Sequence, residues 1–531
     1  MSRKPILSAA EAVMLIADGA TVTTSGFVAS GLPELLSSAL EQRFMETGHP
    51  RDLTLFYSGA QGNKDGSGAD HFAHEGMTRR VIAGHWNLAP NLGRLVLENK
   101  MEGYNLPQGI MCKLYREIAS HSLGYLTHVG LNTFADPRIE GGKLNSISTE
   151  DFVELMEIHG QEQLFFKTIP LDVALIRGTY ADEAGNVTVE REVASLEATS
   201  MAQAVHNCGG KVIVQVERVV QEGSLDPKLV KIPGIYVDAI VVCNESWAQA
   251  QCLGCAYDGS MTGEFRVPAG DLVYPPMSAK KIIGRRAAME LRPDVVVNLG
   301  IGTPEYISMV AGEEGIDQHI TLTVEGGPVG GIPQGGPKFG GSVNVAAILD
   351  QPYQFDFYDG GGLDMAFLGL AQADQSGNIN VSKFGPRVAG CGGFIDITQN
   401  AKKVCFCGTF TAGGLKMHVA DGKLVIDREG HEKKFIRSVE QITFSGDYAR
   451  KIGKPVLYIT ERAVFELRSD GVYLIEVAPG IEIERQILAL MEFAPKLPPE
   501  GPRQMDSRIF QEGRMGLRQK FENAAADTVS A

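Results

Sequence analysis

The chain repeats part of itself. The stretch from residue 172 to 214 matches the stretch from 364 to 406 at a constant offset of 192 residues, without a gap. The octapeptide DEAGNVTV that begins at Asp182, for example, returns as DQSGNINV beginning at Asp374. A repeat of this length indicates that one folding unit occurs twice, so the fold has to contain two similar halves.

The repeat continues upstream with a looser fit. The strand-like run 20–24 and the Pro-Glu pair after it resemble the run 294–298 and its own Pro-Glu pair. Each half alternates β-branched apolar runs with helical patterns, the order that produces parallel sheets with right-handed crossovers. We therefore predict an α/β fold of two tandem, structurally similar domains with mainly parallel sheets and flanking helices.

A stretch rich in glycine, proline and polar residues separates the two halves. Between Asn244 and Met277 the strand and helix periods fade, so we place the boundary there and predict domains at 1–255 and 275–531. In such a tandem the site is expected between the halves, where loops leave the carboxyl ends of strands from both.

Composition and charge exclude several classes of protein. The 531 residues carry a formal net charge of −15, which argues against nucleic-acid or anionic-membrane partners because both need clustered Lys and Arg. No apolar run approaches the roughly 18 residues of a membrane span. The eight scattered cysteines indicate reduced thiols and a cytoplasmic protein. Ser8 and Glu11 form a capping box, so we read the N-terminus as a first helix and not as an export signal.

One loop combines a carboxylate with many glycines. Glu325 stands where a buried strand should end, and four of the next six residues are glycine. Glu is seldom buried, so this placement needs a reason: either Glu325 caps a neighbouring helix, or it reacts with a substrate that approaches the bare backbone. The corresponding residue of the first half is Ser58, so the fold does not require a carboxylate here, which favours a function.

Two further glycine-rich turns offer backbone donors. Gly300 and Gly302 close a strand, and Thr303 is expected to cap the following helix, where N–H groups would receive a phosphate or carboxylate. Gly392 and Gly393 lie in a second turn, whose amides would donate to an oxyanion. A plain tight turn is the alternative at both places.

A third candidate donor comes from the first half. Gln108 follows Pro107 and precedes Gly109, a rigid frame for an amide side chain. The side chain would either reach across the cleft as a donor or bond to its own backbone.

Other patterns do not lead to a site. His71 and His74 lack the glutamate of a zinc protease and a third ligand, and Cys252 and Cys255 have no second pair, so we predict no metal. Residues 84–86, Gly-His-Trp, are read as packing in preference to a substrate contact. The chain has neither a G-x-S-x-G elbow nor a P-loop.

With these motifs in place, the chain resembles the family I coenzyme A-transferases, and within them the fused, single-chain acetate/propionate type. The resemblance runs from the N-terminal helix to about Asp506. Its strongest signature is TVEGGPVGG at 323–331, which looks like the glutamate-glycine motif of the family. The supporting matches are YNLPQG (104–109), HVGLNTFADPR (128–138), QFDFYDGGGLD (354–364), GCGGFIDIT (390–398) and YITERAVF (458–465).

The resemblance implies a ping-pong reaction between an acyl-CoA and a carboxylic acid such as acetate or propionate. Glu325, with a reference pKa of about 4.3, would be ionised at neutral pH and attack the thioester, giving an acyl-glutamyl anhydride and then a glutamyl-CoA thioester. By similarity, the Gln108 side chain and the backbone N–H of Gly392 or Gly393 would stabilise each oxyanion.

The resemblance also implies the partners of the chain. Coenzyme A and acyl-CoA are substrates, and no tightly bound cofactor is expected. The nucleotide end of CoA would lie at Gly300, Gly302 and Thr303, and Gly326 and Gly327 would contact CoA beside the nucleophile. A homo-oligomer such as a tetramer is implied. The physiological acid and the residues of the acyl pocket are not readable.

Two other functions stay open at this point. An acyl-CoA hydrolase would use the same site with water in place of the acceptor acid, and product formation with and without an acceptor separates the two. A non-catalytic acyl-CoA sensor would bind without exchanging labelled acetate into acetyl-CoA, and Glu325 argues against it.

Overall fold

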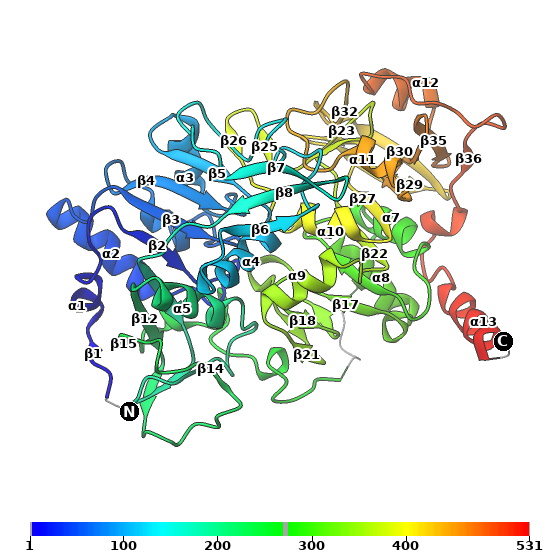
Figure 1. Ribbon diagram of the computed structural model, residues 1–531. Coiled ribbons are helices and arrows are strands. Elements are labelled where there is room, and N and C mark those ends of the chain that lie inside the picture. Colours follow the sequence, from blue (N-terminus) through cyan, green and yellow to red (C-terminus); the bar gives the residue numbers. More distant parts are fainter. Residues whose placement is uncertain (1–2, 269–273, 530–531) are drawn as a thin grey trace.

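The computed structural model describes residues 3–268 and 274–529, and the side chains up to residue 523 (Figure 1). The first half is built on an eight-stranded sheet in which every neighbouring pair is parallel. Its strands, in spatial order, are β1 (Ile6–Leu7), β15 (Ala239–Val242), β12 (Lys211–Val216), β9 (Val173–Arg177), β2 (Thr21–Thr24), β3 (Leu53–Tyr57), β4 (Thr78–Ala83) and β5 (Glu102–Asn105).

The second half is built on a ten-stranded mixed sheet. Its five central strands β33-β27-β22-β16-β17 repeat the parallel order β15-β12-β9-β2-β3 of the first half, which confirms the predicted α/β fold of two similar halves. The strands in spatial order are β21 (Ala347–Ile348), β18 (Pro328–Val329), β17 (Thr321–Thr323), β16 (Val296–Leu299), β22 (Met365–Gly369), β27 (Lys403–Cys407), β33 (Val456–Ile459), β34 (Ala463–Arg468), β35 (Gly471–Val477) and β36 (Arg503–Gln504).

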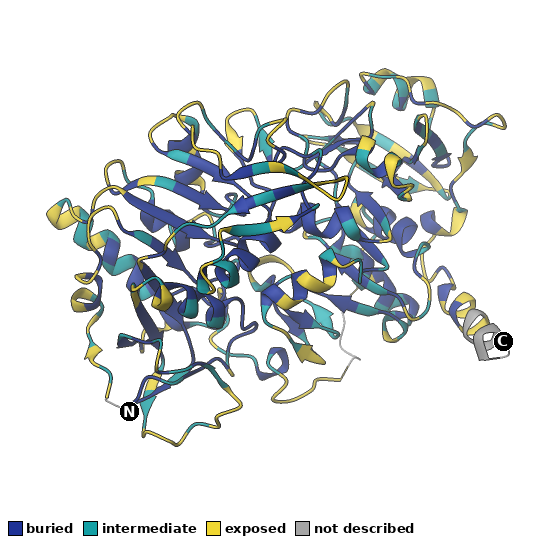
Figure 2. Cartoon of the chain, viewed as in Figure 1, coloured by how far each residue is buried: buried dark blue, intermediate teal, exposed yellow. Residues whose placement is uncertain are grey.

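Helices cover both faces of each sheet, and the strands are the dark, buried centre of each half in Figure 2. Successive residues of a strand point to opposite faces, so the apolar runs fill two cores per sheet. In β9, for example, Ala174 and Ile176 join the core under α4 and α5, whereas Val173 and Leu175 join the core under α1, α2 and α3. The covering helices are α1 (Ala9–Val13), α2 (Glu34–Thr47), α3 (Pro90–Leu97), α4 (Gln108–Ala119), α5 (Ala198–Asn207), α7 (Ala279–Ala288), α8 (Glu305–Glu314), α9 (Gln351–Asp359) and α10 (Phe394–Asn400).

The repeated octapeptide forms the same turn twice. The Asp182 carboxylate accepts from the Asn186 backbone N–H at 2.9 Å, and the Asp374 carboxylate accepts from the Asn378 N–H at 3.0 Å. In both turns the Asn side chain also donates to the Asp. The intervening glycine has a φ of 88° in the first turn and 80° in the second, which side chains with a Cβ seldom adopt. The spacing D-x-x-G-N is therefore set by one local structure.

The halves meet through α4 of the first and α9 and α10 of the second, which lie together at the centre of Figure 1. The apolar core under α4 includes Cys391 and Ile395 of the second half. Charged contacts add to this junction: Lys113 on α4 pairs with Asp359 on α9, and Arg116 donates to Asp356 at 3.0 Å. Loops that leave the sheets near this junction are thereby held at fixed positions.

The predicted boundary at 244–277 includes residues 269–273, which lie outside the described residues. In its described part the chain forms only the short helices α6 (Ser246–Gln249) and η2 (Gly259–Met261). Cys252 and Cys255 exchange two backbone hydrogen bonds in a tight turn, at 3.3 and 3.0 Å. The domain limits 1–255 and 275–531 stay a prediction.

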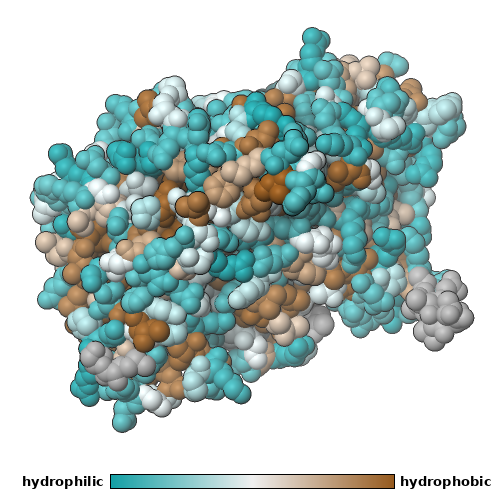
Figure 3. All heavy atoms as spheres, in the orientation of Figure 1, coloured by the Kyte–Doolittle hydropathy of each residue, from teal (hydrophilic) through white to brown (hydrophobic). Residues whose placement is uncertain are grey.

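At the N-terminus, α1 begins after Ser8, and the Ser8–Glu11 capping box is present as predicted. Among the residues that the structure describes, no helix is long and apolar enough to cross a membrane. The face in Figure 3 is mostly hydrophilic, with several separate hydrophobic patches.

Smaller sheets and hairpins extend from the two large sheets. They comprise β10 (Tyr180–Asp182), β11 (Val187–Thr188), β13 (Arg218–Val220) and β14 (Val230–Ile232) in one sheet, and β6 (Gly124–Thr127), β7 (Val153–Ile158) and β8 (Gln161–Lys167) in another. In the second half they comprise β19 (Ile332–Pro333), β20 (Ser342–Val343), β23 (Gln372–Asp374), β24 (Ile379–Asn380), β25 (Lys383–Phe384), β26 (Arg387–Val388), β28 (Thr411–Ala412), β29 (Lys416–Ala420), β30 (Lys423–Arg428), β31 (Glu432–Lys433) and β32 (Phe435–Ile436). The remaining helices are η1 (Gly68–Phe72), η4 (Asp317–His319), η5 (Gly336–Lys338), α11 (Gly446–Lys451), α12 (Ile483–Gln486), η6 (Leu488–Leu490), η7 (Ser507–Phe510) and α13 (Leu517–Val529).

Candidate active site

Glu325 lies just beyond the carboxyl end of β17, in a tight turn to β18. The Val324 N–H donates to the Pro328 carbonyl at 2.9 Å, and the Gly327 N–H donates back to the Val324 carbonyl at 3.0 Å. Gly327 has a φ of 126°, and a Cβ there would lie 2.0 Å from the Leu349 carbonyl oxygen, so only glycine fits. The glycines therefore allow the turn that leaves the Glu325 side chain half-buried at the strand end.

The surroundings of Glu325 change its acidity. Burial raises the pKa of its carboxyl to about 7, and hydrogen bonds from the backbone and from the Asn298 side chain oppose part of this rise. Asn298 is fully buried on β16, and its Nδ2 donates to the Thr323 carbonyl at 3.3 Å. A carboxyl with this raised pKa is less ionised at pH 7 than the ordinary glutamate that the sequence predicts.

Gln108 is the first residue of α4, directly after Pro107 at the end of the loop from β5. Its backbone N–H donates to the Gly392 carbonyl at 3.0 Å, so the residue is fixed to the second half. Its side chain is buried, and its Nε2 has no hydrogen-bond acceptor among the described residues. The Gln108 amide does not bond to its own backbone, and its N–H groups are free to donate to a ligand.

The turn at 390–393 also joins the two halves. The Gly392 N–H donates to the Gly84 carbonyl at 2.8 Å, so this donor is already used. No described residue accepts from the Gly393 N–H, the last residue before α10. Of the two backbone donors offered by the sequence, the structure leaves Gly393 free and Gly392 engaged.

The Phe27 ring lies between the Glu325 turn and Gln108. A Cβ on Gly326 would lie 3.4 Å from Phe27 Cδ1, and a Cβ on Gly59 would lie 2.8 Å from Phe27 Cδ2. The same Gly59 position is 3.4 Å from Gln108 Nε2. The turn that carries Glu325 and the loop beside Gln108 therefore approach the same aromatic ring, although they come from opposite halves of the chain.

Helix α9 supports the same group of loops from behind. Gln354 Nε2 donates to the Val324 carbonyl next to Glu325, at 3.3 Å. The adjacent Phe355 ring lies against the backbone of Gly109 and Gly393, where added Cβ atoms would be 2.5 and 3.1 Å from it. One rigid helix thus contacts all three loops that carry the candidate catalytic groups.

The turn at 300–303 differs from its expected form. Helix α8 begins one residue later than predicted, with Pro304 and not Thr303 at the N-cap, and the Thr303 side chain makes no capping bond. The Gly302 N–H is instead accepted by the Glu305 side chain at 2.9 Å, and the Gly300 N–H donates to the neighbouring strand β22. A carboxylate at this helix start disfavours a phosphate, so nucleotide binding here stays a prediction without structural support.

Gly326 and Gly327 differ in whether their backbone N–H groups are already hydrogen-bonded. The Gly327 N–H is used within the turn, whereas no described residue accepts from the Gly326 N–H. Gly326 is thus the one of the two whose amide is available to a bound substrate.

The two histidines with near-ligand spacing are held by carboxylates. His71 contacts Glu34 at 2.8 Å and Glu41 at 2.5 Å, and His74 contacts Glu41 at 2.6 Å. Within residues 3–268 and 274–523, no group of three or more His, Cys, Asp and Glu side chains is arranged to hold a metal ion.

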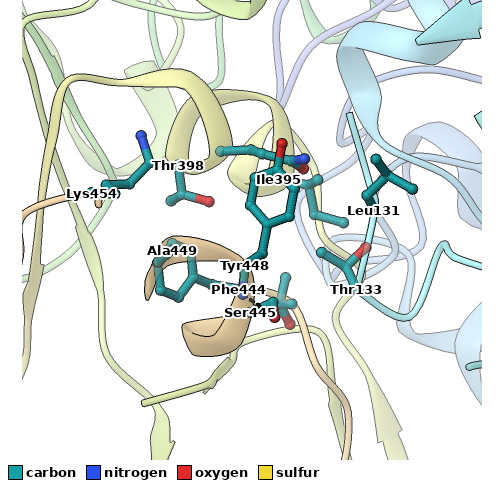
Figure 4. A pocket seen from close by; sticks show the side chains of 11 residues that line it. Leu131, Thr133, Ile395, Thr398, Phe444, Ser445, Tyr448, Ala449 and Lys454 are labelled. Carbon is teal, nitrogen blue, oxygen red and sulfur yellow. Dashed lines mark hydrogen bonds between the residues drawn. The ribbon is translucent and has the colours of Figure 1, made fainter. Parts of the chain in front are cut away.

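A small cavity lies elsewhere in the junction of the halves, beside α10 and α11 (Figure 4). Its space for water is about 10 Å³, enough for roughly one molecule. Leu131 and Thr133 of the first half and Ile395 and Thr398 of α10 line it. None of the predicted catalytic residues does, so it is not the reaction site.

The sequence analysis missed the supporting residues Asn298, Phe27 and Gln354. Asn298 had a usable signal, because a buried strand seldom carries an amide side chain without a polar partner. Phe27 and Gln354 had none, since their roles depend on contacts with loops far away in the sequence.

Comparison with known proteins shows which family the chain belongs to. A family model described as "Coenzyme A transferase" matches residues 6–243. The caffeate CoA-transferase of Acetobacterium woodii is 46% identical over 96% of this chain and 98% of its own length, and the acetate CoA-transferase YdiF of Escherichia coli is 44% identical over 97% of each. The chain belongs to the family I coenzyme A-transferases, in their single-chain form.

The fold agrees with this family. The crystal structure of YdiF apoenzyme from Escherichia coli O157:H7 matches with a TM-score of 0.92 at 43% identity, covering 97% of both chains. A second structure, titled as the YdiF thioester complex with CoA, matches with a TM-score of 0.91. The protein is therefore a CoA-transferase with acyl-CoA as a substrate. Its α/β fold of two similar halves matches the fold of YdiF.

Proposed function

We propose that the protein transfers CoA between a short-chain acyl-CoA and a carboxylic acid such as acetate or propionate, with Glu325 as the nucleophile. The observation that carries this proposal is a half-buried carboxylate at the end of β17, in a turn that approaches the same Phe27 ring as the loop beside an amide donor without a partner. The similarity to a protein whose structure is titled a thioester complex with CoA supports it.

The proposed reaction starts with ionised Glu325. Its carboxylate attacks the thioester carbonyl, the C–S bond breaks, and CoA leaves as a thiolate while a mixed acyl-glutamyl anhydride forms. The thiolate then attacks the glutamyl carbonyl, and the acyl group leaves as a free carboxylate. An incoming carboxylate reverses these steps and departs as the new acyl-CoA, so no external base or oxidant is needed.

Each tetrahedral intermediate carries a negative oxygen. Gln108 Nε2 and the Gly393 N–H have no acceptor among the described residues, and we assign both to this oxygen. Because α4, α9 and the 390–393 turn fix both groups beforehand, little reorganisation opposes the bond when charge develops. Each donor in such a site contributes roughly 3–4 kcal/mol to the rate.

Small changes in pKa matter to this nucleophile. A pKa of about 7 leaves enough carboxylate for attack and makes Glu325 a better nucleophile than an exposed glutamate, because basicity and nucleophilicity rise together. Burial therefore lowers the ionised fraction and raises the reactivity of the fraction that remains.

The test measures transfer and hydrolysis in the same experiment. With acetyl-CoA as donor and ¹³C-labelled propionate as acceptor, labelled propionyl-CoA should form, and CoA should not be released catalytically when the acceptor is omitted. Continued release of CoA without an acceptor would identify a hydrolase instead. Glu325→Gln should abolish transfer, and Glu466→Gln, which changes a carboxylate on β34, serves as the matched control.

Two finer assignments belong to the same proposal. A homo-oligomeric assembly and a cytoplasmic location are supported by family resemblance alone. Gly326 is the residue of the glutamate-glycine turn best placed to contact CoA, because its N–H has no acceptor among the described residues.

A further inference from the structure

Two cysteines lie opposite each other in a tight turn of the segment that links the halves. Cys252 and Cys255 exchange two backbone hydrogen bonds and form an antiparallel bridge. Gly254 between them has a φ of 73°, a left-handed conformation that glycine supplies in tight turns. The Cα atoms of such a hydrogen-bonded pair are about 5.5 Å apart, a separation that a disulfide spans.

The side chains of the two cysteines also meet. Opposite residues of an antiparallel pair project their side chains from the same face. Burial raises the pKa of the Cys252 thiol, and a hydrogen bond between the two thiols adds to this rise. Both side chains pack against one apolar cluster, the Phe27 cluster, which comprises Phe27, Val193, Ala194, Leu196, Met261 and Phe339. The two thiols are therefore in contact, although both are free.

One of the two thiols is accessible from outside. Cys255 is half-buried, as is the isolated Cys208, whereas the other six cysteines are buried. Leu253 and Gly254, next to Cys255, are exposed, so the turn lies at the surface of the protein. Cys252 is only 1% exposed. An accessible thiol beside a buried partner is the arrangement in which oxidation of the first is followed by a disulfide to the second.

The Phe27 cluster connects this turn to the one that carries Glu325. A Cβ on Gly326 would lie 3.4 Å from the Phe27 ring and 3.7 Å from the Ala194 Cβ. Cys252 packs against the same two side chains. Because close-packed apolar groups transmit displacements, a movement of the Cys252 side chain changes the support of the Glu325 turn.

The backbone on each side of the cysteine turn is held in place. Gln251 Nε2 donates to the Arg191 carbonyl at 2.9 Å, and the Asn344 N–H of the second half donates to the Ser260 carbonyl at 2.9 Å. The segment is therefore not free to move as a unit when the two sulfur atoms approach each other. The side chains and the apolar groups packed on them have to adjust instead.

We propose that Cys252 and Cys255 form a reversible disulfide, and that this disulfide slows CoA transfer by displacing the Phe27 cluster against the Glu325 turn. The part that concerns the rate rests on the proposed function, because it takes Glu325 as the nucleophile. The part that concerns the disulfide does not depend on it.

The oxidant is a peroxide. The Cys255 sulfur attacks one peroxide oxygen, the O–O bond breaks, and water leaves while Cys255 becomes a sulfenic acid. The Cys252 sulfur then attacks the Cys255 sulfur, the S–O bond breaks, and a second water leaves with the proton of the Cys252 thiol. Two thiols and one hydrogen peroxide thus give one disulfide and two waters. A dithiol reverses the reaction by thiol–disulfide exchange.

The first measurement detects the bond. The full-length protein without acyl-CoA is treated with hydrogen peroxide, its remaining thiols are alkylated, and its peptides are analysed by mass spectrometry without reduction. The peptide that contains both cysteines should lose two hydrogen atoms, and fragment ions should place this loss at residues 252–255. After treatment with dithiothreitol, both cysteines should be alkylated.

The second measurement follows transfer from acetyl-CoA to propionate after the peroxide is removed. The kcat of the wild type should fall by about tenfold and recover with dithiothreitol, because small displacements of a nucleophile have large effects on rate. Cys255→Ser should start at the wild-type rate and show no loss that dithiothreitol reverses. Cys208→Ser, which removes the other half-buried thiol, is the matched control and should respond as the wild type does.

Three results would overturn the proposal. Peroxide gives no disulfide between Cys252 and Cys255, or the disulfide forms and kcat is unchanged, or Cys255→Ser shows the same reversible loss as the wild type. An untreated protein that transfers no CoA to propionate would contradict the proposed function, and the mass measurement would still decide whether the disulfide forms.

Discussion

The raised pKa of Glu325 makes the rate of the first half-reaction depend on pH in a range where the ionised fraction of an ordinary glutamate hardly changes. With a pKa of about 7, the ionised fraction rises from about one tenth at pH 6 to about nine tenths at pH 8. Because only the carboxylate attacks, the rate of enzyme–CoA thioester formation from acetyl-CoA should rise about tenfold over this interval. The ionised fraction of a glutamate with its usual pKa would change by only about 2%.

The assay is a rapid-quench time course without acceptor acid, in which intact-protein mass spectrometry follows the thioester. Asn298→Leu removes a hydrogen bond that lowers the Glu325 pKa, so the midpoint of the profile should move to higher pH. Asn380→Leu, which removes a buried amide bonded to Gln372, is the matched control and should leave the midpoint in place. A rate that is flat from pH 6 to 8 would refute the argument from burial.

Three further predictions follow from the site. Gln108→Ala should lower kcat by about 10² to 10³ with a smaller effect on KM, and steady-state kinetics showing a change in KM alone would remove the oxyanion role. Chains 1–255 and 275–531 should be inactive alone and regain transfer when co-expressed, because Gln108 and Glu325 lie in different halves; full activity of 275–531 alone would contradict the shared site. Glu325→Gln should stabilise the protein at pH 8 but not at pH 4. Because the pKa of Glu325 is raised in the folded state, its protonation adds to the free energy of unfolding of the wild type below about pH 4.5, and this contribution is lost as the pH rises to about 7. Melting temperatures of wild type and Glu325→Gln at pH 4 and pH 8 check this.

Much of the architecture was readable from the sequence. The 192-residue offset predicted two similar halves, because the same apolar alternation and the same Asp-Gly-Asn turn recur in both. Positions set by local chemistry, such as the Ser8 cap and the strand end before Glu325, were also predictable.

The errors concern contacts that the sequence does not encode locally. Thr303 was expected to cap α8, but the Glu305 side chain accepts the Gly302 N–H instead. The Gly392 N–H was predicted as a donor to an oxyanion, but it donates to the Gly84 carbonyl of the other half. The acidity of Glu325 was missed because it depends on burial between loops from both halves, which no single segment shows.

The central claim is that Glu325 forms the covalent intermediate. The most direct measurement is to incubate the full-length protein with acetyl-CoA alone, treat it with borohydride, and locate the modification by peptide mass spectrometry. Glu325 should be the modified residue, and Glu325→Gln should give no modified peptide. A thioester on another residue, or transfer that continues in Glu325→Gln, would contradict the account.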